Sequence, residues 1–188
     1  MNTDCHLPLI QVRIDELMLR KAATIVALDG NCTAGKTTLA AGLAQVYDCN
    51  VLHMDDFFLR PEQRTPERFA QVGGNVDYER FREEVLQPLL SGRAFSYRPF
   101  DCKSFTLSEP VQIAVKKLNI IEGSYSMHPY FGEAYDLKIL LTVDPELQHR
   151  RVLQRPAFLQ EKFFTQWIPM ENRYLDQFRI ADRADMIL

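Results

Sequence analysis

Residues 23–44, ATIVALDGNCTAGKTTLAAGLA, contain the strongest structural signal in this chain. The apolar run from Thr24 to Leu28 has the composition of a buried β-strand, and the residues that follow Lys36 are good helix formers. Between them lies GNCTAGKT, residues 30–37, which matches the pattern G-x-x-x-x-G-K-[ST] at every fixed position. A strand, a glycine-containing loop and a helix in this order predict a loop that binds phosphate.

Each fixed position of this loop has a chemical reason. Gly30 and Gly35 allow the backbone to turn sharply, so that its N–H groups can approach a phosphate closely. The N-terminus of the following helix adds a partial positive charge. Lys36 is expected to reach the β- and γ-phosphate oxygens, and the Thr37 hydroxyl is expected to bind Mg²⁺.

The expected ligands of this loop are ATP and Mg²⁺. A tight turn with an ordinary surface Lys-Thr pair is the alternative, and the flanking strand and helix favour the nucleotide. The residues expected to contact the nucleotide are Gly30, Asn31, Cys32, Thr33, Ala34, Gly35, Lys36, Thr37 and Thr38.

Composition restricts the class of protein. The chain has 188 residues, of which 46% are hydrophobic and 25% charged, and its net charge is −3. These values are typical of a soluble globular protein, and the length suits one domain over residues 1–188. Residues 1–22 are expected to form an N-terminal helical extension of that domain. Neither the net charge nor any apolar run indicates a nucleic-acid or membrane partner, and the oligomeric state stays open.

The N-terminal sequence and the cysteines indicate the cellular compartment. MNTDCHLPLI lacks the basic region and the long apolar core of a signal peptide. The cysteines are scattered and form no CxxC pair; they are Cys5, Cys32, Cys49 and Cys102. This distribution is typical of reduced thiols, so we expect a cytoplasmic protein.

Apolar runs that suit strands alternate with amphipathic runs that suit helices, which predicts an α/β fold with a mainly parallel sheet. The expected strands lie at 24–29, 49–58, 117–123, 136–144 and 184–188. The expected helices lie at 9–20, 36–47, 77–91, 145–155 and 157–179, the last interrupted at Pro169, with an extended hairpin at 95–115. Because ligands bind beyond the carboxyl ends of parallel strands, the acids at strand ends are expected to edge one crevice. These acids are Asp29, Asp55, Glu122 and Asp144.

The residues after the loop separate three classes of phosphate-loop protein. A GTPase would carry N-K-x-D, and no Asn-Lys pair occurs in this sequence. A mechanical or nucleic-acid ATPase would usually end a strand in Asp-Glu, whereas here Glu122 stands alone and Asp144 precedes a proline. A small-molecule kinase needs an acid beside the γ-phosphate to orient the acceptor hydroxyl. The segment HMDDFF supplies Asp55 and Asp56 in that place, which favours the kinase.

Four segments in order, GNCTAGKTTLA, HMDDFF, NIIEGSY and HRRVLQR, with a weaker fifth, RADMIL, resemble the uridine kinase family. This family of phosphate-loop kinases neighbours nicotinamide riboside kinase and phosphoribulokinase. The resemblance implies a three-layer fold of the P-loop NTPase type, with about five mainly parallel strands, flanking helices and a helical lid at about 155–170. It also implies ATP-dependent phosphorylation of a small-molecule hydroxyl, such as the 5′-hydroxyl of uridine or another nucleoside.

Matched positions imply the roles of the phosphotransfer residues. Asp55, the first acid of DDFF, matches the general base for the acceptor hydroxyl and lies next to the metal. Glu122 matches the carboxylate that completes the Mg²⁺ shell together with Thr37. Lys36 and Arg151 match the cations that offset charge on the transferred phosphoryl group.

The acceptor side is matched by fewer residues. Asp77 matches an acid that binds ribose hydroxyls, and an N-cap role for the same residue stays open. Phe100, with Phe105 as a second aromatic ring, is expected to stack on the acceptor. Arg155 is displaced by one position from the family pattern, in which an aspartate stands at the place of Pro156.

Several alternatives stay open at this point. Lys162 or Arg173 could supply the lid charge that the family places elsewhere. The acceptor could be nicotinamide riboside, pantothenate or a sugar, and the donor could be GTP. A nucleotide-binding regulator without turnover is the alternative from a different functional class.

Overall fold

The computed structural model describes residues 6–188. The first five residues of the predicted N-terminal extension, Cys5 among them, lie outside the described part.

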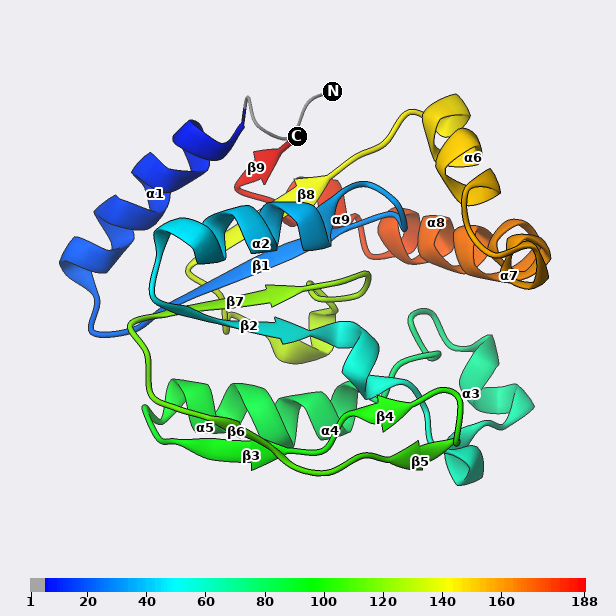
Figure 1. Cartoon of the computed structure of the whole chain (residues 1–188), viewed down its shortest axis with the longest axis horizontal. Coiled ribbons are helices and arrows are strands. Elements are labelled where there is room, and N and C mark those ends of the chain that lie inside the picture. Colours follow the sequence, from blue (N-terminus) through cyan, green and yellow to red (C-terminus); the bar gives the residue numbers. More distant parts are fainter. Residues whose placement is uncertain (1–5) are drawn as a thin grey trace.

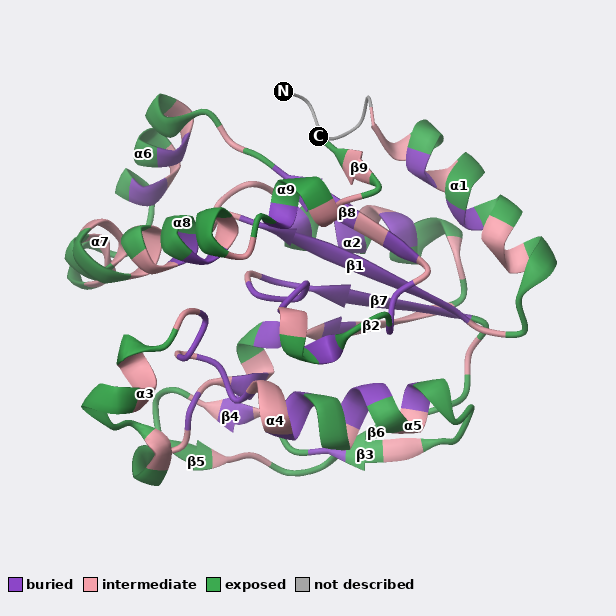
Figure 2. Ribbon diagram, turned by 180° about the vertical axis from the view of Figure 1, so that it is seen from behind, coloured by how far each residue is buried: buried purple, intermediate pink, exposed green. Residues whose placement is uncertain are grey.

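A five-stranded parallel sheet forms the centre of the molecule (Figure 1). Its order is β2 (Cys49–His53), β7 (Leu118–Glu122), β1 (Thr24–Gly30), β8 (Leu137–Leu141) and β9 (Met186–Ile187). Strand β1 is buried at every residue, because it pairs on both edges and is covered on both faces (Figure 2). The α/β class and the mainly parallel sheet predicted from the sequence are therefore confirmed.

Helices cover both faces of the sheet. Helices α1 (Leu7–Arg20) and α2 (Lys36–Val46) bury Ile10, Ile14 and Leu43 against alternate residues of β1. The opposite face packs against the helical stretch 78–90 and against α8 (Ile168–Gln177) and α9 (Ile180–Arg183). The phosphate loop thus projects from the central strand of a three-layer structure.

Two long helices each contain a π-helical turn. One consists of α4 (Tyr78–Phe81), a π-turn over Arg82–Leu86 and α5 (Gln87–Leu90). The other consists of α7 (Ala157–Lys162), a π-turn over Phe163–Trp167 and α8. The prediction that Pro169 interrupts the second helix is wrong. A proline cannot donate the N–H that an α-helical turn requires, and a wider turn before it lets the helix continue.

Shorter elements complete the chain. They are the 3₁₀ turns at Met54–Phe57, Pro61–Gln63 and Pro129–Phe131, helices α3 (Pro66–Ala70) and α6 (Pro145–Leu153), and strands β3 (Phe95–Tyr97), β4 (Phe100–Asp101), β5 (Thr106–Leu107) and β6 (Val111–Ile113). Antiparallel pairing of β3 with β6 and of β4 with β5 confirms the predicted hairpin. Over residues 6–188, no helix combines the length and the apolar character that crossing a bilayer requires.

Candidate active site

The phosphate loop joins β1 to α2 at the carboxyl edge of the sheet. Both of its glycines have positive φ angles, 134° at Gly30 and 103° at Gly35. A Cβ atom on Gly30 would lie only 1.9 Å from the carbonyl oxygen of Leu141 in β8. The loop therefore needs glycine at its first position for two reasons, its turn and the close approach of the neighbouring strand.

Lys36 lies folded back across this loop. Its ammonium donates hydrogen bonds to the carbonyl oxygens of Gly30 and Asn31, both at 2.8 Å, and to Ser124 Oγ at 3.3 Å. The residue is only 7% exposed. The positive charge is consequently held at the mouth of the loop, where the sequence pattern predicts it.

Thr37 and Glu122, the predicted metal-binding pair, are brought together. The Thr37 hydroxyl lies 3.2 Å from both carboxylate oxygens of Glu122, which ends β7 and is 5% exposed. Two distant sequence motifs thus meet because β7 and the phosphate loop end at the same edge of the sheet.

His53 joins this pair, although no sequence motif had singled it out. Its Nδ1 lies 2.6 Å from Glu122 Oε1, and this hydrogen bond is the main reason why the pKa of His53 is raised above its usual range. His53 and Glu122 are register partners in the parallel pairing of β2 with β7. The sequence feature that could have identified His53 is its position as the last residue of the strand, directly before MDDFF.

The donor chemistry here suits Mg²⁺. A threonine hydroxyl and a carboxylate are hard oxygen ligands, and Mg²⁺ commonly takes the rest of its octahedral shell from phosphates and water. Among residues 6–188, no three His, Cys, Asp or Glu side chains cluster as a complete metal site. Thr37 and Glu122 thus provide side-chain oxygen atoms of the kind that Mg²⁺ binds.

Asp55 and Asp56 lie in the 3₁₀ turn that follows β2, so the strand ends earlier than the sequence predicted. Asp56 Oδ2 accepts a hydrogen bond from the Tyr97 hydroxyl at 2.7 Å, and its carbonyl oxygen accepts one from Arg80 at 2.9 Å. Asp56 is thereby tied to the hairpin and to the helix that begins at Tyr78.

Asp55 has different neighbours. The residue is exposed, yet desolvation by surrounding protein atoms raises the pKa of its carboxylate, and the nearby charge of Glu122 raises it further. The charges of Lys36 and His53 lower the same pKa by smaller amounts. The pKa of Asp55 thus reports the charges of both Lys36 and Glu122.

Two of the four acids expected to edge one crevice lie elsewhere. Asp29 is fully buried, and its carboxylate accepts hydrogen bonds from the backbone N–H groups of Gly30, Tyr125 and Met127. Asp144 caps α6 by accepting from the N–H groups of two residues in its first turn. Strand-end position alone did not distinguish structural acids from those that face the cleft.

Glu171, on α8, is a site residue that sequence reasoning missed. Its carboxylate accepts hydrogen bonds from the N–H of Cys32 at 2.8 Å and from Ser124 Oγ at 2.9 Å, and burial raises its pKa. On the next turn of the same helix, the Tyr174 hydroxyl donates to Asp29 Oδ2 at 2.6 Å. The long helix of α7, the π-turn and α8, which includes most of the predicted lid at 155–170, is therefore fixed to the phosphate loop through α8.

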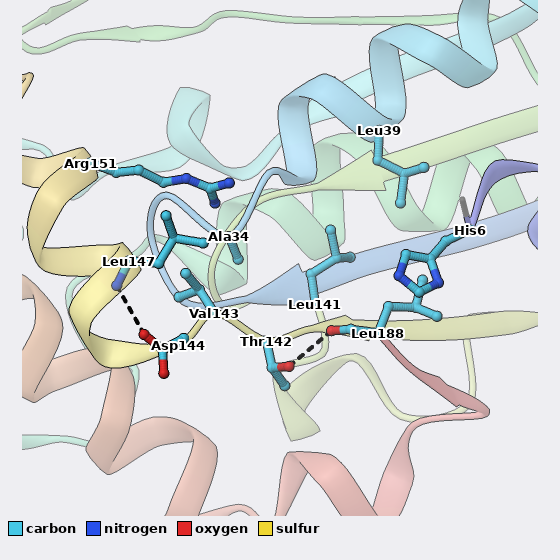
Figure 3. Close-up of a pocket in the computed structure, with 10 residues that line it drawn as sticks. All are labelled: His6, Ala34, Leu39, Leu141, Thr142, Val143, Asp144, Leu147, Arg151 and Leu188. Carbon is cyan, nitrogen blue, oxygen red and sulfur yellow. Dashed lines mark hydrogen bonds between the residues drawn. The ribbon is translucent and has the colours of Figure 1, made fainter. Parts of the chain in front are cut away.

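Arg151 extends from α6 to the other side of the phosphate loop. Its guanidinium donates a hydrogen bond to the Thr33 carbonyl at 2.6 Å. The same side chain lines a small cavity of about 140 Å³, whose wall is largely apolar and includes Leu39, Val143 and Leu147 (Figure 3). Arg155, the next predicted cation along the chain, is exposed beyond the end of α6.

Asp77 and Phe100, predicted to contact the acceptor, are both largely buried. Asp77 accepts a hydrogen bond from the N–H of Arg80 at 3.2 Å, so it is an N-cap, and its Oδ2 lies 3.7 Å from Arg60 Nε. Phe100 is 5% exposed and packs edge-to-face on Phe105, which is 49% exposed. Their contact with an acceptor stays a prediction.

Comparison with known proteins identifies the fold. No family model and no curated protein matches the chain. Among solved structures, a possible uridine kinase from Bacillus stearothermophilus has a TM-score of 0.70 at 22% identity, covering 95% of this chain and 98% of its own. A fructose transport system kinase candidate from Silicibacter sp. TM1040 has a TM-score of 0.67 at 22% identity, covering 100% and 99%. The chain therefore shares the fold of uridine kinase-like P-loop kinases, as its sequence predicted.

Proposed function

We propose that this protein is an ATP-dependent kinase that transfers the γ-phosphoryl group to a hydroxyl of a small molecule. The observation that carries the proposal is the convergence of Lys36, Thr37, Glu122 and Asp55 at one edge of the sheet. These residues come from three separate segments and supply a cation, two oxygen ligands and an acid. That combination suits phosphoryl transfer, in which positioning and charge stabilisation do most of the work.

Each of these residues has a task in the transfer. Asp55 orients the acceptor hydroxyl, whose oxygen forms a bond to the γ-phosphorus while the bond from that phosphorus to the β–γ bridging oxygen breaks. The hydroxyl proton passes late to the Asp55 carboxylate, and ADP leaves with the electron pair of the broken bond. Lys36 and Arg151 offset the negative charge that moves between the two oxygens.

Thr37, Glu122 and Asp55 would hold Mg²⁺, which would neutralise negative charge on the phosphates of the donor. Residues 155–170, in the single domain that we assign to the chain, act as a lid. Its closure would exclude water, since otherwise the enzyme would hydrolyse ATP.

The apolar cavity beside Arg151 supports a nucleotide donor. It lies against the phosphate loop at Ala34 and against the start of α2 at Leu39, so a base there could remain joined to phosphates in the loop. We assign this cavity to the adenine of ATP.

For the acceptor, the resemblance to uridine kinases makes the 5′-hydroxyl of a nucleoside such as uridine the first candidate. Nicotinamide riboside, pantothenate and sugars are the other candidates, because the acceptor side of the chain departs most from the uridine kinase pattern. The predicted partner is thus a small molecule, without nucleic acid or membrane, and the cytoplasmic location stays a prediction.

The test is ADP release with and without a panel of these acceptors, for the wild type, Lys36→Met and Lys117→Met. Methionine keeps most of the side-chain volume of the buried Lys36, and Lys117 is an exposed lysine at the opposite end of β7. Thermal unfolding of all three proteins checks that they fold.

Acceptor-dependent ADP release that is lost in Lys36→Met and kept in Lys117→Met supports the kinase. ATP binding without turnover on any acceptor would instead identify a nucleotide-binding regulator and overturn the proposal.

A further inference from the structure

A second, larger cavity lies between the segment around α3 and the helix that contains α7 and α8, two parts that face each other across the molecule (Figure 1). Its volume is about 620 Å³. Arg64, Phe69 and Asn75 contribute one wall, and Trp167 and Arg173 contribute the other. None of the described residues that line it is acidic.

The two arginines of this cavity have no carboxylate partner. Within residues 6–188, five arginines form ion pairs, at positions 13, 60, 68, 80 and 179, and Arg64 and Arg173 are among the ten that form none. Arg173 crosses to the opposite wall and donates a hydrogen bond to the carbonyl of Ala70 at 3.0 Å. Two positive charges therefore line one cavity without compensation from the protein.

Arg64 is held in place by aromatic rings. Its guanidinium carbon lies 5.3 Å from the ring centre of Phe69 and 5.6 Å from that of Phe105. Such stacking orients a guanidinium while leaving its N–H groups available along their own plane. Arg64 Nη1 also donates a hydrogen bond to the carbonyl of Leu59 at 3.4 Å, so the two rings and this contact together hold the guanidinium.

This arrangement is close to the candidate base. Val76, which follows Asn75 of the cavity wall, pairs in an isolated antiparallel bridge with Phe58, three residues after Asp55, so the cavity adjoins the segment that carries the candidate base. Asn75, on the cavity wall, has a buried Oδ1 atom without a hydrogen-bond partner. An unpaired buried carbonyl oxygen is an acceptor that a ligand hydroxyl can satisfy.

We propose that the acceptor carries an anionic group, a phosphate or a carboxylate, which Arg64 and Arg173 bind while its hydroxyl faces Asp55. Arginine suits both anions, because its planar fork donates two parallel hydrogen bonds to either of them. Phe69 and Trp167 provide flat apolar walls for the body of the molecule. This inference rests on the proposed kinase function and narrows its substrate class, since a neutral nucleoside leaves both arginines unpaired.

The experiment compares two matched pairs of acceptors, D-ribose with D-ribose 5-phosphate and D-glucose with D-gluconate. The proteins are the wild type, Arg64→Gln, Arg173→Gln and the control Arg93→Gln, an exposed arginine between α5 and β3. Both kcat/KM and KM for ATP are measured. Calorimetric binding of each compound to protein saturated with Mg²⁺ and a non-hydrolysable ATP analogue provides a readout without turnover.

The anionic member of at least one pair is expected to bind and react at least 10-fold better than its neutral partner. Each cavity variant loses one charge-assisted hydrogen-bonding group, so its binding of the anion and its kcat/KM for the anion should fall by about 10- to 100-fold. KM for ATP should be unchanged, and Arg93→Gln should behave like the wild type. Equal use of the neutral partners, or no calorimetric binding of either anion, overturns the inference.

A rise in KM for ATP in place of KM for the acceptor also overturns the inference, because the arginines would then serve the donor. Failure of the kinase proposal is distinguishable from these results. If the kinase proposal alone were wrong, the wild type would bind the anion in calorimetry and Arg64→Gln would not, but no acceptor would cause ADP release.

Discussion

Asp55 and Asp56 are adjacent in the chain but have different environments. The Asp56 carboxylate is bound to the Tyr97 hydroxyl, whereas Asp55 lies near Glu122 and Lys36. Both acids lie in a 3₁₀ turn and not in the strand that the sequence predicted, and the role of Asp55 as general base stays a prediction.

We predict that Asp55→Asn lowers kcat by about 10²–10⁴, the usual effect of removing a positioned acid or base, with little change in ATP affinity. Asp56→Asn should lower kcat less, because it perturbs the Tyr97 contact and not the reacting hydroxyl. The measurement is kcat and ATP affinity for both variants at saturating acceptor. An inactive Asp56→Asn beside a normal Asp55→Asn would show that the register of the motif is wrong by one residue.

His128 provides a prediction about pH. Burial lowers its pKa to about 4, and its ring stacks 4.4 Å from that of Tyr78. Because the folded pKa is below the unfolded value of about 6.5, the stabilisation is present above pH 6.5 and is lost as the pH falls toward 4. The wild type should therefore lose about 2 kcal/mol of unfolding free energy from this group between pH 7 and pH 5.

Urea denaturation at these two pH values measures that loss. His128→Phe keeps an aromatic ring and removes the titrating group, so its stability should depend less on pH by about the same amount. An identical pH dependence in the two proteins would show that His128 titrates normally in the folded state.

At the scale of single residues, local motifs predicted Lys36, Thr37, Glu122 and Asp55 because each motif carries its chemistry within a few positions. Glu171 could not be predicted in this way. Its hydrogen bond to Cys32 joins residues 139 positions apart, and nothing in the periodicity of α8 marks it.

Among the elements, α8 connects most directly to the phosphate loop. Glu171 and Tyr174 lie one turn apart on this helix and contact the loop and the buried carboxylate of Asp29. The sequence predicted the helix but not its π-turn, because the pattern of apolar residues reports which face is buried and not the hydrogen-bond spacing. The same limitation produced the incorrect interruption at Pro169.

Removing the Tyr174 hydroxyl should destabilise this attachment. Tyr174→Phe leaves the buried Asp29 without one of its hydrogen-bond donors, which should cost about 1–3 kcal/mol of unfolding free energy. Tyr130→Phe is the matched control, since Tyr130 is 42% exposed. Equal stability of the two variants in urea denaturation would show that the contact with Asp29 contributes little.

For the whole molecule, the sequence predicted the α/β class and the number of strands, but not their order. Pairing of β1 with β7 and β8 joins segments that are about 90–110 residues apart, and local composition does not encode such pairing. Because Asp29 lies in β1, between β7 and β8, the same strand pairing places its carboxylate inside the protein.

A donor that binds only the folded state should stabilise the whole chain. At ATP concentrations about 100 times the dissociation constant, Mg²⁺·ATP should add about 2.7 kcal/mol. For a chain of this length that corresponds to a rise of roughly 5–10 °C in Tm. Differential scanning calorimetry measures the shift, which Lys36→Met should abolish and EDTA should reduce; a full shift in Lys36→Met would contradict the assigned phosphate site.

The hydrogen bonds around Asp29 also have a consequence for synthesis on the ribosome. Asp29 immediately precedes the phosphate loop, but its donors Tyr125, Met127 and Tyr174 are translated much later, the last of them 145 residues afterwards. At about 5–20 residues per second, this delay is roughly 7–30 s. Until β7 is translated at residues 118–122, the apolar strand β1 has neither of its neighbours, β7 and β8, and is exposed to chaperones and to aggregation. A nascent chain released before Tyr174 would contain the whole phosphate-loop motif without the contacts that shape it.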